Sequence, residues 1–140
     1  KTKELGTTLI AFSPVGRSLL TDNPLEFEAC RELAFMKVNP RFQPGNYERN
    51  IERTNQLRAM ASDMGVSTSG LAIAWLLAKG DHVVPIPGTR SVEHLNELAS
   101  GADLELSPSD VEAIEKVLPI GWCHGDRYSA DQWQGPERYC

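Results

Sequence analysis

The sequence predicts a parallel α/β fold, to which these 140 residues contribute one part. Two short apolar segments, residues 7–12 and 82–86, are rich in β-branched side chains, and helical segments follow each of them. Buried strands that alternate with helices are typical of parallel sheets. Two strands cannot form such a sheet alone, because a parallel sheet needs more neighbours and cover on both faces. We therefore expect both strands to be covered on both faces within a larger barrel or sheet.

The composition narrows the class of protein. A chain of 140 residues can bury a hydrophobic core, and its net charge of −5 disfavours a general nucleic-acid-binding protein. The longest apolar run, residues 71–78, is too short to span a bilayer. Three cysteines without metal-ligand spacing, in a sequence that shows no signal peptide, favour free thiols in a cytoplasmic protein. They are Cys30, Cys123 and Cys140.

The first predicted strand, residues 7–12, ends at the Ser-Pro turn that begins at Ser13. Residues 22–47 contain three prolines and lack clean periodicity, so we expect a long connection with one helical turn around residues 26–33. Connections of this length are usually functional or disordered.

Four helices are predicted from apolar periodicity and from capping residues. The first spans residues 47–64 and stops at Gly65, and the second begins at Ser67 or Thr68 and runs to Lys79. After the second strand, a short helix covers residues 91–99. Ser107 then caps a helix that has Pro108 at its first position and ends at Leu118.

The loop after the first strand is the first candidate binding site. Phe12 can stack on a flat ring, Ser13 and Arg17 can bind phosphate oxygens, and Gly16 allows close approach of the backbone. The alternative is a simple capped turn with a core phenylalanine and a solvated arginine.

The loop after the second strand is the second candidate. Gly88, Thr89 and Arg90 lie before a helix that carries His94 and Glu97, so positions 90, 94 and 97 can face one ligand. Free amides and the helix dipole attract anions at this position. The alternative is an ordinary helix cap with surface charge. The two loops together predict a site for the phosphates of a dinucleotide.

No catalytic set is recognisable, so we assign no catalytic residue to this chain. Nucleophile-elbow, zinc-protease, P-loop and Cys-His patterns are all missing from the sequence. The tail, residues 119–140, forms one wall of a substrate pocket or packs over the barrel. Its chemically notable side chains are Trp122, His124, Arg127, Tyr128, Trp133 and Tyr139.

The two loops resemble signatures of the aldo-keto reductase family. Residues 11–18 (AFSPVGRS) resemble the family pattern AYSPLGRG, and residues 86–98 resemble IPGTRxxxxLxEN. Segments 39–50 and 71–76 resemble the family's long loop after the seventh strand and its seventh helix. The resemblance spans residues 3–117. It implies that residues 1–140 belong to one (β/α)8 TIM barrel and supply its seventh and eighth strands, their helices and a C-terminal tail or lid over residues 119–140.

The resemblance also implies NADPH-dependent reduction of a small aldehyde or ketone, and it assigns roles to the loop residues. Phe12 takes the place of the aromatic residue that stacks on nicotinamide, and Leu98 replaces the usual adenine-binding Asn that follows Glu97. The residues at the pyrophosphate position are Ser13, Val15 and Arg17, with Pro14 and Gly16 between them. The residues at the 2′-phosphate position are Gly88, Thr89 and Arg90. His94 occupies a position that some branches of the family fill with Arg.

The family's catalytic Asp, Tyr, Lys and His come from the first half of the barrel. We therefore expect an N-terminal part of the barrel as partner and an inactive isolated segment. Neither a nucleic acid nor a membrane is expected as a partner. Two alternatives remain: a non-enzymatic, cofactor-sensing subunit of a larger assembly, as in potassium-channel β subunits, and a truncated chain without function.

Overall fold

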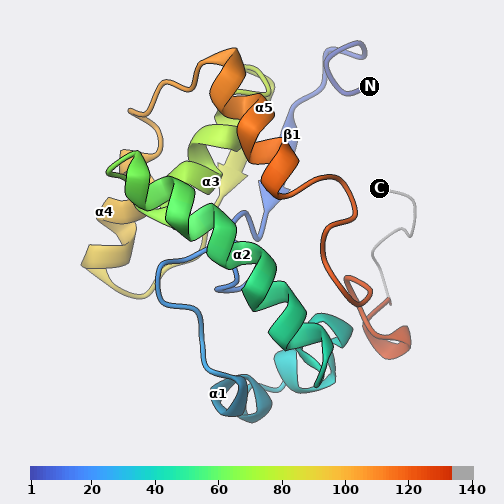
Figure 1. Ribbon diagram of the computed structural model, residues 1–140. Coiled ribbons are helices and arrows are strands. Elements are labelled where there is room, and N and C mark those ends of the chain that lie inside the picture. The colour runs from blue at the N-terminus through green and yellow to red at the C-terminus, as the bar shows by residue number, and fades with distance from the viewer. Residues whose placement is uncertain (134–140) are drawn as a thin grey trace.

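The computed structural model describes residues 1–133, so Tyr139 and Cys140 lie outside the described residues. Its helices and strands follow the predicted order (Figure 1). They are β1 (Leu9–Phe12), α1 (Phe27–Glu32), α2 (Asn46–Asp63), α3 (Thr68–Leu77), β2 (Val83–Ile86), α4 (Val92–Ser100) and α5 (Pro108–Val117). Three short 3-10 helices were not expected: Met36–Val38, Pro40–Phe42 and Ala130–Trp133. The predicted boundaries are correct to within about two residues at most helix and strand ends.

The two strands pair in parallel, as predicted. Their register runs from Leu9 opposite Val83 to Phe12 opposite Ile86. Because the strands are parallel, the loops that follow both of them leave from the same edge. This arrangement brings the two candidate loops to one end of the molecule.

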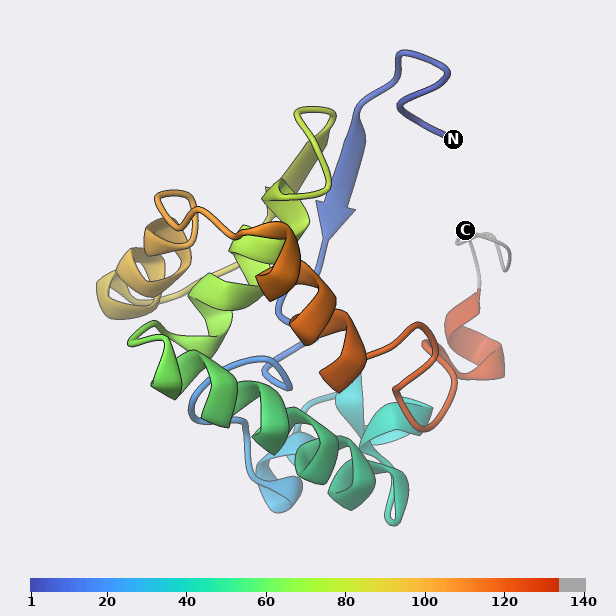
Figure 2. The same ribbon diagram turned by 45° about the horizontal axis from the view of Figure 1, so that its top comes forward.

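The described chain supplies only part of the cover expected for its strands within a larger barrel or sheet. Helix α3 packs beside β2, and Val83 is buried there. Leu9, on the same face as Val83, is 44% exposed, because α3 lies beside β2 and leaves β1 open (Figure 2). Side chains on the opposite face are about half exposed, and residues 1–133 supply no other strand. These exposed residues are Ile10, Phe12, Val84 and Ile86.

The core has two parts. Helices α2, α3 and α5 bury Leu57, Ala61, Leu71 and Ile114 against one another. A second cluster lies beneath the long connection and contains Leu19, Cys30, Met36, Phe42 and Tyr47. The long connection is therefore packed, with a short helix where one turn was expected. Both described cysteines, Cys30 and Cys123, are free thiols, and burial raises the pKa of each.

Two fully buried asparagines, Asn39 in the long connection and Asn50 in α2, hold the tail. The Asn39 side-chain amide donates to the backbone oxygen of Arg127 at 2.8 Å. Asn50 accepts from the His124 backbone N–H at 2.7 Å and donates to the His124 oxygen at 3.0 Å. Gly125 lies so close that a Cβ there would be 2.6 Å from the oxygen of Pro40. The tail backbone is thus held at residues 124–127.

Within residues 1–133, no helix is long and apolar enough to cross a membrane.

Helix α4 ends in close contact with α3, and this contact depends on glycine. A Cβ at Gly101 would lie 2.3 Å from the backbone oxygen of Gly70. We expect Gly101→Ala to lower the free energy of unfolding by about 1–3 kcal/mol, because the two backbones must separate. Urea denaturation measures the change, with Ala102→Ser at the exposed neighbouring position as the control. Equal stabilities for the two variants would contradict this packing.

Candidate cofactor site

The two predicted loops line one cavity of about 670 Å³. Eight of the predicted site residues border it: Val15, Arg17, Gly88, Thr89, Arg90, His94, Glu97 and Leu98. The cavity also borders side chains that the sequence analysis did not single out, among them Asp22 and Ser69. Its volume lies within the range of about 300–1,000 Å³ that is usual for cofactor and small-molecule sites.

The first loop has an unusual backbone. Three of its non-glycine residues have positive φ angles: Ser13 at 52°, Arg17 at 57° and Ser18 at 80°. Such residues are uncommon, and strained backbone of this kind is concentrated at functional sites. A hydrogen bond of 3.0 Å from the Gly16 N–H to the Ser13 oxygen closes the turn. The loop is thus more than a simple capped turn.

The Arg17 side chain is partly buried and packs against aromatic rings. Its guanidinium carbon lies 4.2 Å from the centre of the Phe35 ring and 5.4 Å from that of Tyr128. Burial lowers the pKa of Arg17 from its ordinary value, but a guanidinium remains charged in proteins. Arg17 therefore brings a fixed positive charge to the wall of the cavity.

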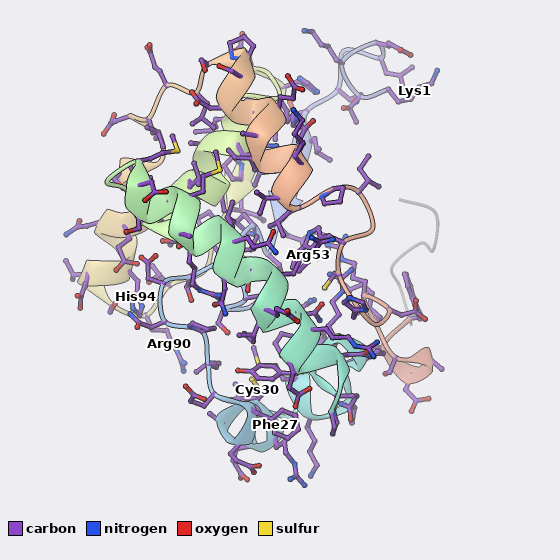
Figure 3. All side chains as sticks on the ribbon, in the orientation of Figure 1. Lys1, Phe27, Cys30, Arg53, Arg90 and His94 are labelled. Atoms are coloured by element: carbon purple, nitrogen blue, oxygen red, sulfur yellow. The ribbon has the colours of Figure 1, made fainter. Side chains whose placement is uncertain are left out.

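The second loop presents its cations at the start of α4. Ser91 caps the helix, and its hydroxyl accepts from the His94 N–H at 3.1 Å. The Thr89 hydroxyl donates to the Ser91 oxygen at 3.2 Å, which orders the loop. Arg90 and His94 are exposed and project from neighbouring positions (Figure 3). Within residues 1–133 neither forms an ion pair, so the Arg90 guanidinium and the His94 ring are both available to an anion.

The cavity's carboxylates are already engaged by hydroxyl and amide donors. Asp22 accepts from the backbone N–H of Thr68 at 3.0 Å and from its hydroxyl, and so caps α3. The Glu97 carboxylate accepts a long hydrogen bond from Ser69 at 3.4 Å. Leu98 is buried, so at this position the cavity has an apolar wall.

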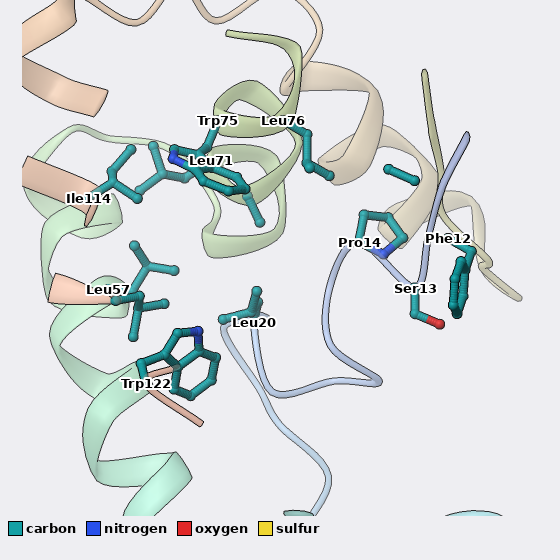
Figure 4. Close-up of a pocket in the computed structure, with 13 residues that line it drawn as sticks. Phe12, Ser13, Pro14, Leu20, Leu57, Leu71, Trp75, Leu76, Ile114 and Trp122 are labelled. Atoms are coloured by element: carbon teal, nitrogen blue, oxygen red, sulfur yellow. The ribbon is translucent and has the colours of Figure 1, made fainter. Parts of the chain in front are cut away.

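The remaining first-loop residues face a different hollow. Phe12, Ser13 and Pro14 border an apolar space of about 250 Å³, opposite Leu57 and Trp122 (Figure 4). None of these three borders the larger cavity. Phe12 is about half exposed in the described chain.

The tail reaches this end of the sheet. The guanidinium carbon of Arg127 lies 4.5 Å from the centre of the Phe12 ring. Tyr128 is buried and contacts Phe35 and Trp133 edge to face, with ring centres 6.1 Å and 5.1 Å apart. No local sequence pattern indicated the Arg127–Phe12 contact, because the two residues are far apart along the chain.

The larger cavity suits a phosphorylated nucleotide by its chemistry. Arg17 and Arg90 offer cationic groups, His94 offers a ring N–H donor, and the start of α4 offers backbone N–H groups. The nearby carboxylates already have partners. A model of the Aldo/keto reductase family matches residues 1–119. The chain belongs to the aldo-keto reductase family.

Other aldo-keto reductases match most of this chain with about one third of their own length. The protein named aldo-keto reductase str7 of Strobilurus tenacellus is 31% identical over 128 residues, which are 89% of this chain and 37% of the relative. A Schizosaccharomyces pombe protein named aldo-keto reductase yakc [NADP(+)] is 31% identical over 126 residues, 90% of this chain and 37% of its own. A probable aldo-keto reductase 1 of Glycine max is 32% identical over 126 residues, 90% of this chain and 36% of its own.

A solved structure shares the fold. The glycerol dehydrogenase AKR11B4 from Gluconobacter oxydans superposes with a TM-score of 0.66 at 19% identity, over 85% of this chain and 36% of that chain. The parallel pair of strands with its helices is consistent with part of a barrel. This aldo-keto reductase chain thus spans a little over one third of the length of its relatives.

Proposed function

We propose that the protein containing this chain is an NADPH-dependent oxidoreductase that reduces aldehydes or ketones to alcohols. Membership of the family supports an oxidoreductase, and the NADP(+) in the name of the yeast relative is consistent with the cofactor. The observation that carries the proposal is the shared cavity, where two loops from neighbouring strands combine unpaired cations with a helix N-terminus.

Each loop would hold a different part of the cofactor. Arg90, with Gly88, Thr89 and His94, would bind the 2′-phosphate, and Val15 and Arg17 would lie along the pyrophosphate. Glu97 would accept a hydrogen bond from the adenine, and Leu98 would pack without donating one. Phe12 would stack on the nicotinamide, which when bound supplies the hydride to the carbonyl carbon.

The proton donor would come from outside this chain. Among residues 1–133, no tyrosine or lysine borders either cavity, and the one histidine that does, His94, lies at the phosphate end of the larger cavity. We propose that the remaining barrel packs on the exposed sheet face of Ile10, Phe12, Val84 and Ile86 and carries the catalytic acid.

The test uses the complete protein as its source expresses it. NADPH binding is measured by calorimetry, and oxidation of NADPH is then followed with a panel of aldehydes and ketones. The proposal predicts tight binding of NADPH and turnover with at least one carbonyl compound. Binding without turnover on any of them would favour a cofactor-sensing subunit, and no binding of NADPH would contradict the proposed site.

A further inference from the structure

Arg127 holds a defined position over the ring of Phe12. Its backbone oxygen accepts a hydrogen bond from the side chain of the buried Asn39. Slightly earlier in the tail, the Asn50 side chain accepts from the backbone N–H of His124 and donates to its backbone oxygen. These hydrogen bonds fix the tail backbone. The guanidinium carbon of Arg127 lies 4.5 Å from the centre of the Phe12 ring. At this distance the cation contacts the negative face of the ring directly.

Within the described residues, no ion pair neutralises the charge on Arg127. No carboxylate of residues 1–133 forms an ion pair with it, although the chain carries five more acidic than basic residues. Its other close neighbours are the Tyr128 ring, 5.7 Å from the guanidinium carbon, and the cationic Arg17. A positive charge thus acts on any group that lies against Phe12.

We propose that Arg127 makes the site discriminate between the two redox states of the cofactor, favouring the reduced one. This inference rests on the proposed function, in which the nicotinamide ring lies against Phe12. The oxidised ring carries a positive charge and the reduced ring carries none. Arg127 therefore repels the oxidised ring and not the reduced one.

This repulsion favours binding of the reduced cofactor and therefore favours reduction. The reduced cofactor binds without a Coulombic penalty, and the oxidised cofactor formed by the reaction dissociates more readily. For two charges at neighbouring positions in a partly exposed site, we expect a contribution of about three- to tenfold to the ratio of the two dissociation constants.

The test replaces Arg127 by glutamine in the complete protein. Dissociation constants for NADP+ and NADPH are measured by calorimetry in the wild type, Arg127→Gln and Arg127→Lys. We expect the preference for NADPH over NADP+ to fall about three- to tenfold in Arg127→Gln and to be largely retained in Arg127→Lys, which keeps the charge. Adenosine 2′,5′-bisphosphate, which lacks nicotinamide, should bind equally to all three proteins.

A matched control is available at Arg31. Its guanidinium also lies over a phenylalanine ring, 6.0 Å from the centre of Phe27, but outside both cavities. Arg31→Gln should leave the ratio of the NADP+ and NADPH dissociation constants unchanged. An unchanged ratio in Arg127→Gln, or equal changes for both cofactor forms, would overturn the inference while the proposed function stands. Failure of the wild type to bind any of the three nucleotides would instead refute the proposed function.

Discussion

Replacing Arg90 by alanine is expected to weaken NADPH binding by about ten- to a hundredfold and to change NADH binding less than twofold. Arg90 is exposed at the start of α4, has no ion-pair partner within residues 1–133 and borders the cavity. A hydrogen bond between charged groups contributes about 1.5–3 kcal/mol, and only NADPH has the 2′-phosphate that would receive it. Calorimetric titration of the complete protein with both cofactors measures the difference.

The control for Arg90 is another exposed arginine. Arg49 lies on α2 and borders neither cavity, so Arg49→Ala removes the same charge without touching the candidate site. Its affinities for NADPH and NADH should match those of the wild type. An equal loss of both cofactors in Arg90→Ala would show that Arg90 does not recognise the 2′-phosphate.

Replacing Asn50 by alanine is expected to lower the free energy of unfolding by about 3 kcal/mol. The side chain is fully buried and forms three hydrogen bonds with the backbone: to the oxygens of Arg41 and His124 and from the N–H of His124. Each buried group left without a partner costs about 1–3 kcal/mol, and part of this cost is recovered where water enters. Denaturant unfolding measures the loss.

The same variant should release the tail. Limited proteolysis is expected to cleave residues 122–133 sooner in Asn50→Ala than in the wild type, because the held segment around His124 loses its anchor. Gln56→Ala is the control, since Gln56 is exposed on the same helix. A loss of less than about 1 kcal/mol, or an unchanged cleavage rate, would contradict the role given to Asn50.

Local signals predicted the helices well. Ser67 and Ser107 cap α3 and α5 through hydrogen bonds to the backbone N–H groups of Gly70 and Asp110, as their positions indicated. The Ser107 hydroxyl and backbone N–H also lower the pKa of Asp110, which completes a capping box. The 3-10 helices were missed because segments of three or four residues carry no periodicity.

Local sequence patterns did not predict contacts between residues that lie far apart in the chain. The strands were expected to be covered on both faces within a larger barrel or sheet, and the described chain supplies part of that cover through α3 beside β2. The Ser-Pro turn after Phe12 pointed to a binding loop, whereas its positive φ angles and the contact of Arg17 with Phe35 appeared only in three dimensions. Nothing in the sequence indicated that Arg127 would lie over Phe12.

The most direct test of the shared site is a crystal structure of the complete protein with NADP+. A shared site predicts that the 2′-phosphate lies between Arg90 and His94 and that the pyrophosphate crosses to Val15 and Arg17, within the cavity that both loops line. A cofactor that contacts only one of the two loops, or that binds elsewhere on the protein, would contradict it.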